Sequence, residues 1–304
     1  MYNTEWKEAY MEDAHLEKAD QITAQLHFNL VEPKEIEYDK DLSLFDRDEI
    51  LDVYKFINPT STAYLSRLKA TLFKYTDYCK SAGYISADTV NPYDNFTVDD
   101  LVSCLNTELM QNKILSRQSI LNMCISIAPR EAFAILCLFE GIEGKGCREI
   151  ANIKESDIDF KKKVIHLETR EISVSDELLH FARLANELNY TYMYPSKQSI
   201  DLSPSPYIVK NTILAKGNKA TPVSWRNIAN SVKKVLAMYN LDDYITSKNI
   251  RESGKLYYVQ LRAQELGLSF DETLKQEKEL VKIERRFDCK INGYLMRKTY
   301  KDHL

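Results

Sequence analysis

Apolar residues recur with the period of an α-helix through most of the chain. The strongest pattern predicts an amphipathic helix after Thr60 or Ser61, with an apolar face formed by Tyr64, Leu65, Leu68, Leu72, Tyr75 and Cys79. A shorter helix is expected over residues 46–56, and another begins at Asp99. Residues 41–112 therefore predict a compact, all-helical domain.

The first 40 residues are polar and acidic, and they predict an N-terminal arm that precedes this domain. A helical pattern runs from Glu5 to about Leu30. It is expected to end before Pro33, because proline removes a backbone donor and clashes with the preceding turn.

Residues 113–304 predict a second domain. Its centre is a helix over residues 131–142 that is apolar on nearly every side, as a buried helix is. Two alternating stretches, 163–167 and 171–174, flank a tight turn and predict a β-hairpin. Further helices are expected to begin at Ser116, Ser175, Ser224, Thr246 or Ser247, and Asp271. The expected fold is mainly α with a small β-hairpin, in two domains.

Several kinds of chemistry have no support in the sequence. The six cysteines have no CxxC spacing, the five histidines have no HExxH spacing, and no glycine-rich phosphate loop is present. No apolar run approaches the roughly 20 residues of a membrane-spanning helix, and the first residues lack the features of a secretory signal. We therefore expect no metal, no cofactor, no membrane contact and a cytoplasmic location.

The net charge of −4 conceals an uneven distribution of charged residues. Residues 1–112 hold 10 Lys and Arg against 21 Asp and Glu, a net charge of −11. Residues 113–304 hold 31 against 24, a net charge of +7. A basic C-terminal part favours an anionic partner.

Basic residues on three predicted helices are suited to a phosphate backbone, since each neutralised phosphate adds salt-dependent affinity. On the helix after Thr246 they recur at spacings that share one face, and on the helix before it they lie mainly off the apolar side. The candidate DNA-binding residues are Lys248, Arg251, Lys255, Arg226, Lys233, Lys234, and, on or near the long helix of the first domain, Arg67, Lys69 and Lys74. A solvated basic face without a ligand is the alternative.

Two segments resemble the signature boxes of the tyrosine recombinase (phage integrase) family. Residues 245–253, Ile-Thr-Ser-Lys-Asn-Ile-Arg-Glu-Ser, are similar to the second box, roughly Thr-Pro-His-Asp-Leu-Arg-His-Thr. Residues 139–159 resemble the first box, roughly Thr-Gly-Leu-Arg-x-x-Glu-Ile-x-x-Leu-x-x-x-Asp-Ile-Asp, which a β-hairpin follows. The helical domain with its 91–93 loop, Asn-Pro-Tyr, resembles the family's core-binding domain. The resemblance covers roughly residues 15–300 and implies two domains that clamp duplex DNA.

The resemblance also implies where catalytic groups should lie. In the family, two arginines, a histidine or lysine, and a hairpin lysine stabilise the transferring phosphate, and a tyrosine attacks it. Aligned on Glu149, the first arginine falls at Gly146, and Arg148 lies about 200° around the helix from that position. The hairpin turn is too short to present the usual lysine, and Arg170 is its only cation.

The second box keeps some of these groups. Lys248 takes the place of the histidine, Arg251 is the second arginine, and the acidic Glu252 follows it. Tyr294 or Tyr300 would be the nucleophile. Losing one donor from such a site costs about 10²–10³ in rate, so we expect a catalytically degenerate centre with DNA binding retained.

The whole chain resembles the master-repressor (MrpR) family of SPβ-like Bacillus prophages. That resemblance implies a non-enzymatic transcriptional repressor that binds double-stranded operator DNA in the bacterial host, near the nucleoid, and maintains lysogeny. We expect Arg251→Ala and Lys248→Ala to weaken DNA binding. The sequence does not decide whether the protein binds an antirepressor or associates with itself, and it does not give the operator sequence.

Two other functions are compatible with the sequence. An active integrase would need Arg148 or another cation to replace the lost arginine, and it would form a covalent adduct with DNA through Tyr294 or Tyr300. A protein-interaction module on a retired scaffold is suggested by the acidic first domain, and it would bind no DNA above background.

Overall fold

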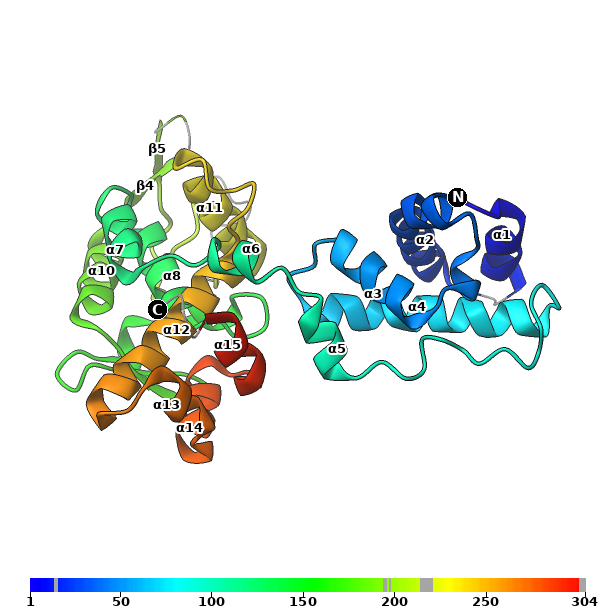
Figure 1. Cartoon of the computed structure of the whole chain (residues 1–304). Helices are drawn as coiled ribbons and strands as arrows, with labels where there is room; N and C mark the ends of the chain where they lie inside the picture. The colour runs from blue at the N-terminus through cyan, green and yellow to red at the C-terminus, as the bar shows by residue number, and fades with distance from the viewer. Residues whose placement is uncertain (14–15, 194–195, 197, 214–220, 301–304) are drawn as a thin grey trace. The chain divides into compact units, whose positions relative to one another are not determined.

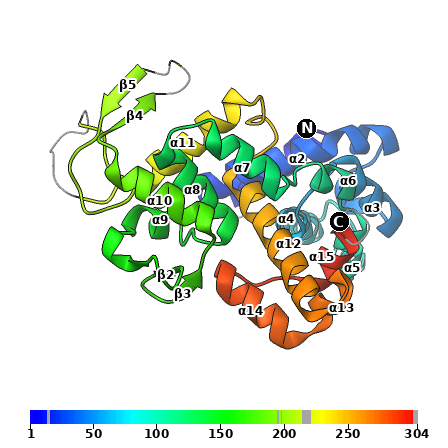
Figure 2. The same cartoon turned by 90° about the vertical axis from the view of Figure 1, so that its left-hand side faces the viewer.

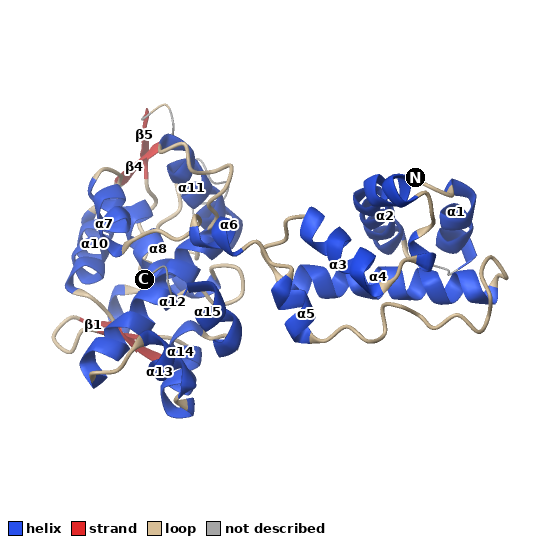
Figure 3. Ribbon diagram, viewed as in Figure 1, coloured by secondary structure: helices blue, strands red, loops and turns tan. Residues whose placement is uncertain are grey.

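The computed structural model describes residues 1–13, 16–193, 196, 198–213 and 221–300, and it divides into two compact units (Figure 1). Unit 1 is Met1–Met110 and unit 2 is Gln111–Leu304. Both are mainly helical, and the described strands form two small antiparallel sheets in unit 2 (Figure 3). The predicted fold class is confirmed. Among the described residues, no helix is both long and apolar enough to cross a membrane.

Unit 1 consists of helices, and side-chain caps fix the starts of α3 and α5. Asp46 accepts hydrogen bonds from two backbone N–H groups and begins a helix, as predicted. The helix expected at Asp99 begins earlier, because Thr97 and Asp100 form a reciprocal capping box. The elements are α1 (Thr4–Asp13), α2 (Lys18–Tyr38), the 3-10 turn η1 (Leu42–Leu44), α3 (Arg47–Phe56), α4 (Thr62–Ser81) and α5 (Val98–Ser103), while α6 (Thr107–Gln111) spans the boundary between the units.

The first 40 residues, expected to be an arm, lie in unit 1, where α1 and α2 both pack against α4. Lys7 of α1 and Glu35 of α2 form a fully buried ion pair at 2.6 Å. Pro33, expected to end the helix, lies inside α2. Proline there removes one backbone hydrogen bond, and burial of neighbours such as Val31 compensates for that loss.

The loop at residues 91–93 is fixed to the core of unit 1. The Asn91 amide donates to the carbonyl oxygen of Phe73 at 3.0 Å. Tyr93 is fully buried, and its hydroxyl donates to the carbonyl oxygen of Leu42 at 2.9 Å. These hydrogen bonds satisfy polar groups that burial would otherwise leave without partners.

Unit 2 surrounds one central helix. Its elements are α7 (Arg117–Ile125), α8 (Pro129–Glu140), α9 (Arg148–Asn152), η2 (Glu155–Asp157), β1 (Ile158–Asp159), β2 (Val164–His166), β3 (Glu171–Ser173), α10 (Asp176–Glu187), β4 (Tyr190–Met193), β5 (Gln198–Asp201), α11 (Trp225–Met238), α12 (Ser247–Leu266), α13 (Phe270–Lys275), α14 (Glu277–Phe287) and α15 (Gly293–Tyr300). The predicted caps at Ser116 and Ser175 are confirmed, because each hydroxyl accepts a hydrogen bond from the first turn of its helix.

Helix α8 is the predicted buried helix. Every residue from Arg130 to Phe139 is buried, and α7, α10, α11 and α12 pack around the helix (Figure 2). The closest approach is made by Gly254 of α12. A Cβ atom added there would lie 2.6 Å from the carbonyl carbon of Phe139 and closer still to its oxygen. Glycine thus allows the two helix backbones to come together.

The predicted β-hairpin is confirmed as β2 and β3, and the short strand β1 extends it to a sheet of order β1-β2-β3. The register places Ile158 opposite Ile165, and Ile165 opposite Ile172. All three isoleucines are buried, so one row of side chains attaches the sheet to the core.

Two features of unit 2 differ from the sequence prediction. The hairpin of β4 and β5 has no counterpart among the elements expected from the sequence. The helix expected from Asp271 is divided into α13 and α14, because the backbone at Gln276 is extended. The basic tail begins with α15.

Candidate functional site

The start of α12 carries the best-preserved segment of the second signature box. Thr246 and Asn249 form a capping box, in which the Asn249 side chain accepts from the Thr246 backbone N–H at 2.9 Å. Lys248 is exposed on the first turn. The cap fixes where the helix begins, so Lys248 and Arg251 project one turn apart from a rigid element.

The second arginine of the box, Arg251, is bound inside the protein. Its Nη1 lies 2.8 Å from a carboxylate oxygen of Glu143, and its Nη2 donates to the carbonyl oxygen of Phe287. The side chain is about four-fifths buried. The guanidinium charge is therefore neutralised by the chain itself, where the family resemblance implies a phosphate.

Lys255 is a correction to the predicted cationic face. Its side chain is 8% exposed and its Nζ lies 2.6 Å from a Glu252 carboxylate oxygen. Arg262, further along the same face, pairs with Glu279 at 2.9 Å. Burial and these carboxylate partners occupy both cations, and α8, α13 and α14 all pack against α12.

Gly146, where alignment on Glu149 places the first arginine, has a backbone conformation that disfavours an arginine. Its φ is +64°, and the ring of Trp225 lies 3.3 Å from where a Cβ would stand. A side chain there would adopt a left-handed conformation and displace the indole. Arg148 is exposed on α9, with Lys145 exposed just before it.

The hairpin cation Arg170 points into the protein. Its guanidinium donates to both carboxylate oxygens of Glu149, at 2.5 and 2.8 Å, and to the carbonyl oxygen of Gly141 at 3.0 Å. Only 4% of the side chain is exposed. Arg170 therefore secures the hairpin to the first box and does not extend toward a ligand.

The two candidate nucleophiles differ in environment. Tyr300 is buried in α15, and burial raises the pKa of its hydroxyl, an effect to which the nearby Glu252 adds. Tyr294 is 46% exposed on the same helix. In the part of the chain that the structure describes, no hydrogen bond joins either hydroxyl to Lys248 or Arg251.

Helix α11 presents the clearest exposed basic surface of unit 2. Its apolar side is buried at Ile228, Val232, Val235 and Leu236. Arg226, Lys233 and Lys234 are exposed, and the Arg226 guanidinium lies 5.3 Å from the ring centre of Trp225. These three cations form what we call the α11 basic surface.

In unit 1, the candidates on α4 divide into two groups. Arg67 and Lys74 are exposed and seven residues apart, which places them on the same side of the helix. Lys69 is half-buried and donates to the carbonyl oxygen of Phe96 at 3.1 Å. Its ammonium group therefore has a structural partner already.

Glu143 is the important residue that the sequence prediction missed. The alignment on Glu149 leaves it outside the box. Aligned instead on Gly141-Ile142, the pattern Thr-Gly-Leu-Arg places Glu143 where the family has its first arginine. The Gly-Ile pair before Glu143 is therefore the sequence signal that could have identified this residue. It is easily missed, because this alignment requires an insertion after Glu143.

Comparison with known proteins gives one family and a set of solved structures. Residues 115–303 match the model of the MrpR C-terminal catalytic domain, and residues 1–81 match that of the MrpR N-terminal core-binding domain. No match is found among curated proteins.

The solved structures similar to this chain share little sequence with it. XerA recombinase is 11% identical over 98% of both chains, with a TM-score of 0.39. The integrase of transposon Tn1549, in complex with circular intermediate DNA, is 12% identical over 96% of this chain and 92% of its own, with a TM-score of 0.47. A form of that integrase in which lysine replaces one arginine, also with circular intermediate DNA, gives 12% and 0.46, over 97% and 93% of the chains.

The two family models match residues in both units of the molecule. One covers the whole region that holds the two boxes, the hairpin and the α11 basic surface, and the other covers the chain from α1 through α4. With most of its length matched, the chain belongs to the MrpR family, a family with a core-binding and a catalytic domain.

Proposed function

We propose that this protein is a sequence-specific repressor that binds double-stranded operator DNA, maintains prophage lysogeny and performs no strand exchange. The observation that supports the absence of strand exchange is the ion pair between Arg251 and Glu143. An arginine held by a carboxylate at 2.8 Å has no free charge for a transferring phosphate. As part of the same proposal, the protein acts in the cytoplasm of the bacterial host, and an antirepressor protein is its candidate partner.

Loss of chemistry follows from three positions together. Neither Gly146 nor Glu143, the two positions that the two alignments give to the first arginine, supplies a cation, Arg170 is buried against Glu149, and Arg251 is neutralised. Loss of one donor lowers the rate by about 10²–10³. The free-energy costs of several losses are not simply additive, but together they leave no useful phosphoryl transfer.

DNA affinity is proposed to come from exposed cations rather than from the old catalytic centre. The supporting observation is the α11 basic surface, with Lys248 exposed on the next helix and Arg67 and Lys74 exposed on α4. We assign Arg251, Lys255 and Lys69 to structural contacts within the protein, since each already has a partner.

We expect that replacing Arg226, Lys233 and Lys234 with alanine weakens DNA binding and flattens its salt dependence. The slope of log K against log salt should fall in magnitude by about 0.9 for each lost phosphate contact, so by about 2.7 for three. Affinity is measured by fluorescence anisotropy with operator and unrelated duplexes between 50 and 300 mM salt, roughly the range where the effect is large.

The matched control replaces Lys275, Lys278 and Lys282 of α13 and α14, which removes the same charge elsewhere in unit 2. It should leave the slope nearly unchanged. Equal slopes for wild type and the α11 variant would reject the assignment of these contacts. No binding by the wild-type protein would favour the protein-interaction alternative.

A second experiment addresses catalysis. A nicked DNA substrate that traps covalent intermediates should give no protein–DNA adduct on a denaturing gel. Tyr294→Phe and Tyr300→Phe should both bind DNA as the wild type does. An adduct that one of these substitutions abolishes would show that the protein is an active recombinase.

A further inference from the structure

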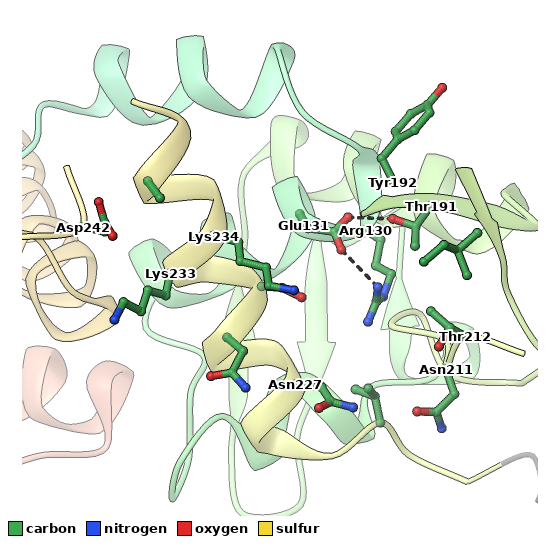
Figure 4. A pocket seen from close by; sticks show the side chains of 15 residues that line it. Arg130, Glu131, Thr191, Tyr192, Asn211, Thr212, Asn227, Lys233, Lys234 and Asp242 are labelled. Atoms are coloured by element: carbon green, nitrogen blue, oxygen red, sulfur yellow. Dashed lines mark hydrogen bonds and ion pairs between the residues drawn. The ribbon is translucent and has the colours of Figure 1, made fainter. Parts of the chain in front are cut away.

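A pocket of about 420 Å³ lies in unit 2, away from the signature boxes. It is open to solvent on one side and lined by the start of α8, the hairpin strand β4, residues 211–212 and one side of α11 (Figure 4). This volume falls within the range of small-molecule sites. Apart from Lys233 and Lys234, its lining residues take no part in the proposed DNA contacts.

Arg130 stands inside this pocket with most of its hydrogen-bonding capacity unused. The residue is 8% exposed, yet within the described residues its guanidinium makes one ion pair, Nη1 to Glu131 at 3.1 Å. Its Nε is buried and has no hydrogen-bond partner. A guanidinium has five N–H groups, and leaving them without acceptors in a buried place is costly. Figure 4 shows the guanidinium directed into the space beside Asn227 and Thr212.

Glu131 does not satisfy this arginine. Its other carboxylate oxygen accepts from the Thr191 hydroxyl at 3.0 Å, and it lies in the first turn of α8, where backbone N–H groups favour its charge. The carboxylate therefore has partners of its own on the wall of the pocket, and Arg130 keeps free N–H groups on the side that faces the space.

The rest of the lining suits an anion. Lys233 and Lys234 add two cations from α11, and Asp242 is the one further carboxylate among the lining residues described. Side-chain amides of Asn211 and Asn227 can donate hydrogen bonds to ligand oxygens. Ile200 and Val223 supply apolar surface for the body of a small molecule.

We propose that this pocket binds a small ligand through a carboxylate or phosphate group placed on Arg130. The oxyanion supplies the acceptors that Arg130 lacks, in the paired geometry that a planar guanidinium favours. Thr212 and the two asparagines hold the polar remainder of the ligand.

The pocket and the α11 basic surface share Lys233 and Lys234. An anion bound there lowers the positive charge that α11 offers to DNA, so ligand and DNA weaken each other's binding by the same factor. This coupling rests on the proposed DNA-binding function, whereas binding of the ligand does not. The site thus offers a route by which a metabolite relieves repression.

The test uses inorganic phosphate and citrate as probes and the whole protein without DNA. Isothermal titration and thermal unfolding are followed in each anion and in sodium chloride of equal ionic strength. Wild type should bind at least one probe saturably, in the millimolar range, and gain thermal stability beyond that in chloride. Arg130→Gln should reduce the affinity at least tenfold, and Arg285→Gln, which removes an exposed arginine of α14, should not.

A second variant guards against misfolding of Arg130→Gln. Asn227→Leu fills the pocket from an exposed position of α11 and should also abolish saturable binding. Equal effects of phosphate, citrate and chloride on the wild type would overturn the proposal, as would unchanged binding in both variants. Loss of DNA affinity by Arg130→Gln in buffer free of both probes would assign the site to a DNA phosphate instead of a small ligand.

Discussion

Gly254→Ala should destabilise unit 2 by about 3 kcal/mol. Alanine is favoured over glycine in a helix by about 1 kcal/mol, but here the added methyl group would overlap the backbone of α8 at Phe139. Backbone atoms cannot rotate away as a side chain can, so α12 must move off α8 and lose packing along its length. The overlap therefore outweighs the helix propensity.

The two tryptophans allow unit 2 to be followed separately. Trp6 lies in α1 and Trp225 begins α11, so a Trp6→Phe background leaves tryptophan, which can be excited apart from tyrosine, only in unit 2. For a unit of this size, 3 kcal/mol lowers the midpoint of thermal unfolding by roughly 6–12 °C. Gln264→Ala, at an exposed position of the same helix, is the control and should change the midpoint little. A midpoint for Gly254→Ala within 2 °C, roughly, of the control would contradict the close approach of α8 and α12.

Arg170→Met should cost about 3–5 kcal/mol, because it leaves the Glu149 carboxylate buried without its charge partner. Arg170 is 4% exposed and donates to three acceptors, so solvent screening weakens the interaction little. The unpaired Nε of Arg170 reduces the loss slightly. Urea unfolding followed through Trp225 measures the change.

A double-mutant cycle separates the ion pair from the packing. Glu149→Gln and Arg170→Met should each destabilise the protein, and the double variant should be more stable than the sum of the two losses implies. Additive losses would show that the pair contributes nothing beyond its individual packing. Arg183→Met, at an exposed position of α10, is the matched control.

The stability of the Arg170→Met variant should depend on pH. Burial raises the pKa of Glu149 above its ordinary value, and Arg170 opposes that shift. Without Arg170 the pKa rises further, so the native state takes up a proton at a pH where the unfolded chain is still ionised. Stability of Arg170→Met should therefore increase as pH falls from 8 toward 5, roughly, and a flat profile would contradict a buried, ionised Glu149.

Local pattern predicts the elements well, because helix caps and periodicity act over a few residues. The capped start at Asp46, the hairpin of β2 and β3, and the buried α8 all follow from signals within one element. The prediction at Pro33 is wrong because its single lost hydrogen bond is offset by the packing of α2, which residues distant in sequence provide.

The candidate site is harder to predict, because pairing between charges depends on the fold. Spacing places Lys255 on a cationic face, but only the fold shows that its side chain is 8% exposed and paired with Glu252. The sequence identifies Arg251, but not Glu143, about 110 residues before it. Arg130 adjoins the predicted buried helix, and the pocket around it is built from segments that the sequence separates by up to 112 residues.

The packing of Trp225 over Gly146 has an evolutionary consequence. A mutation that placed arginine at residue 146 would strain the backbone at φ +64° and press its Cβ against the ring of Trp225, 3.3 Å away. Glu143 would have to change as well, since it already occupies Arg251. Each single step back is harmful unless the others have occurred. If the protein is the inactive repressor proposed above, genetic selection for revertants of the catalytic centre should therefore return none with a single substitution.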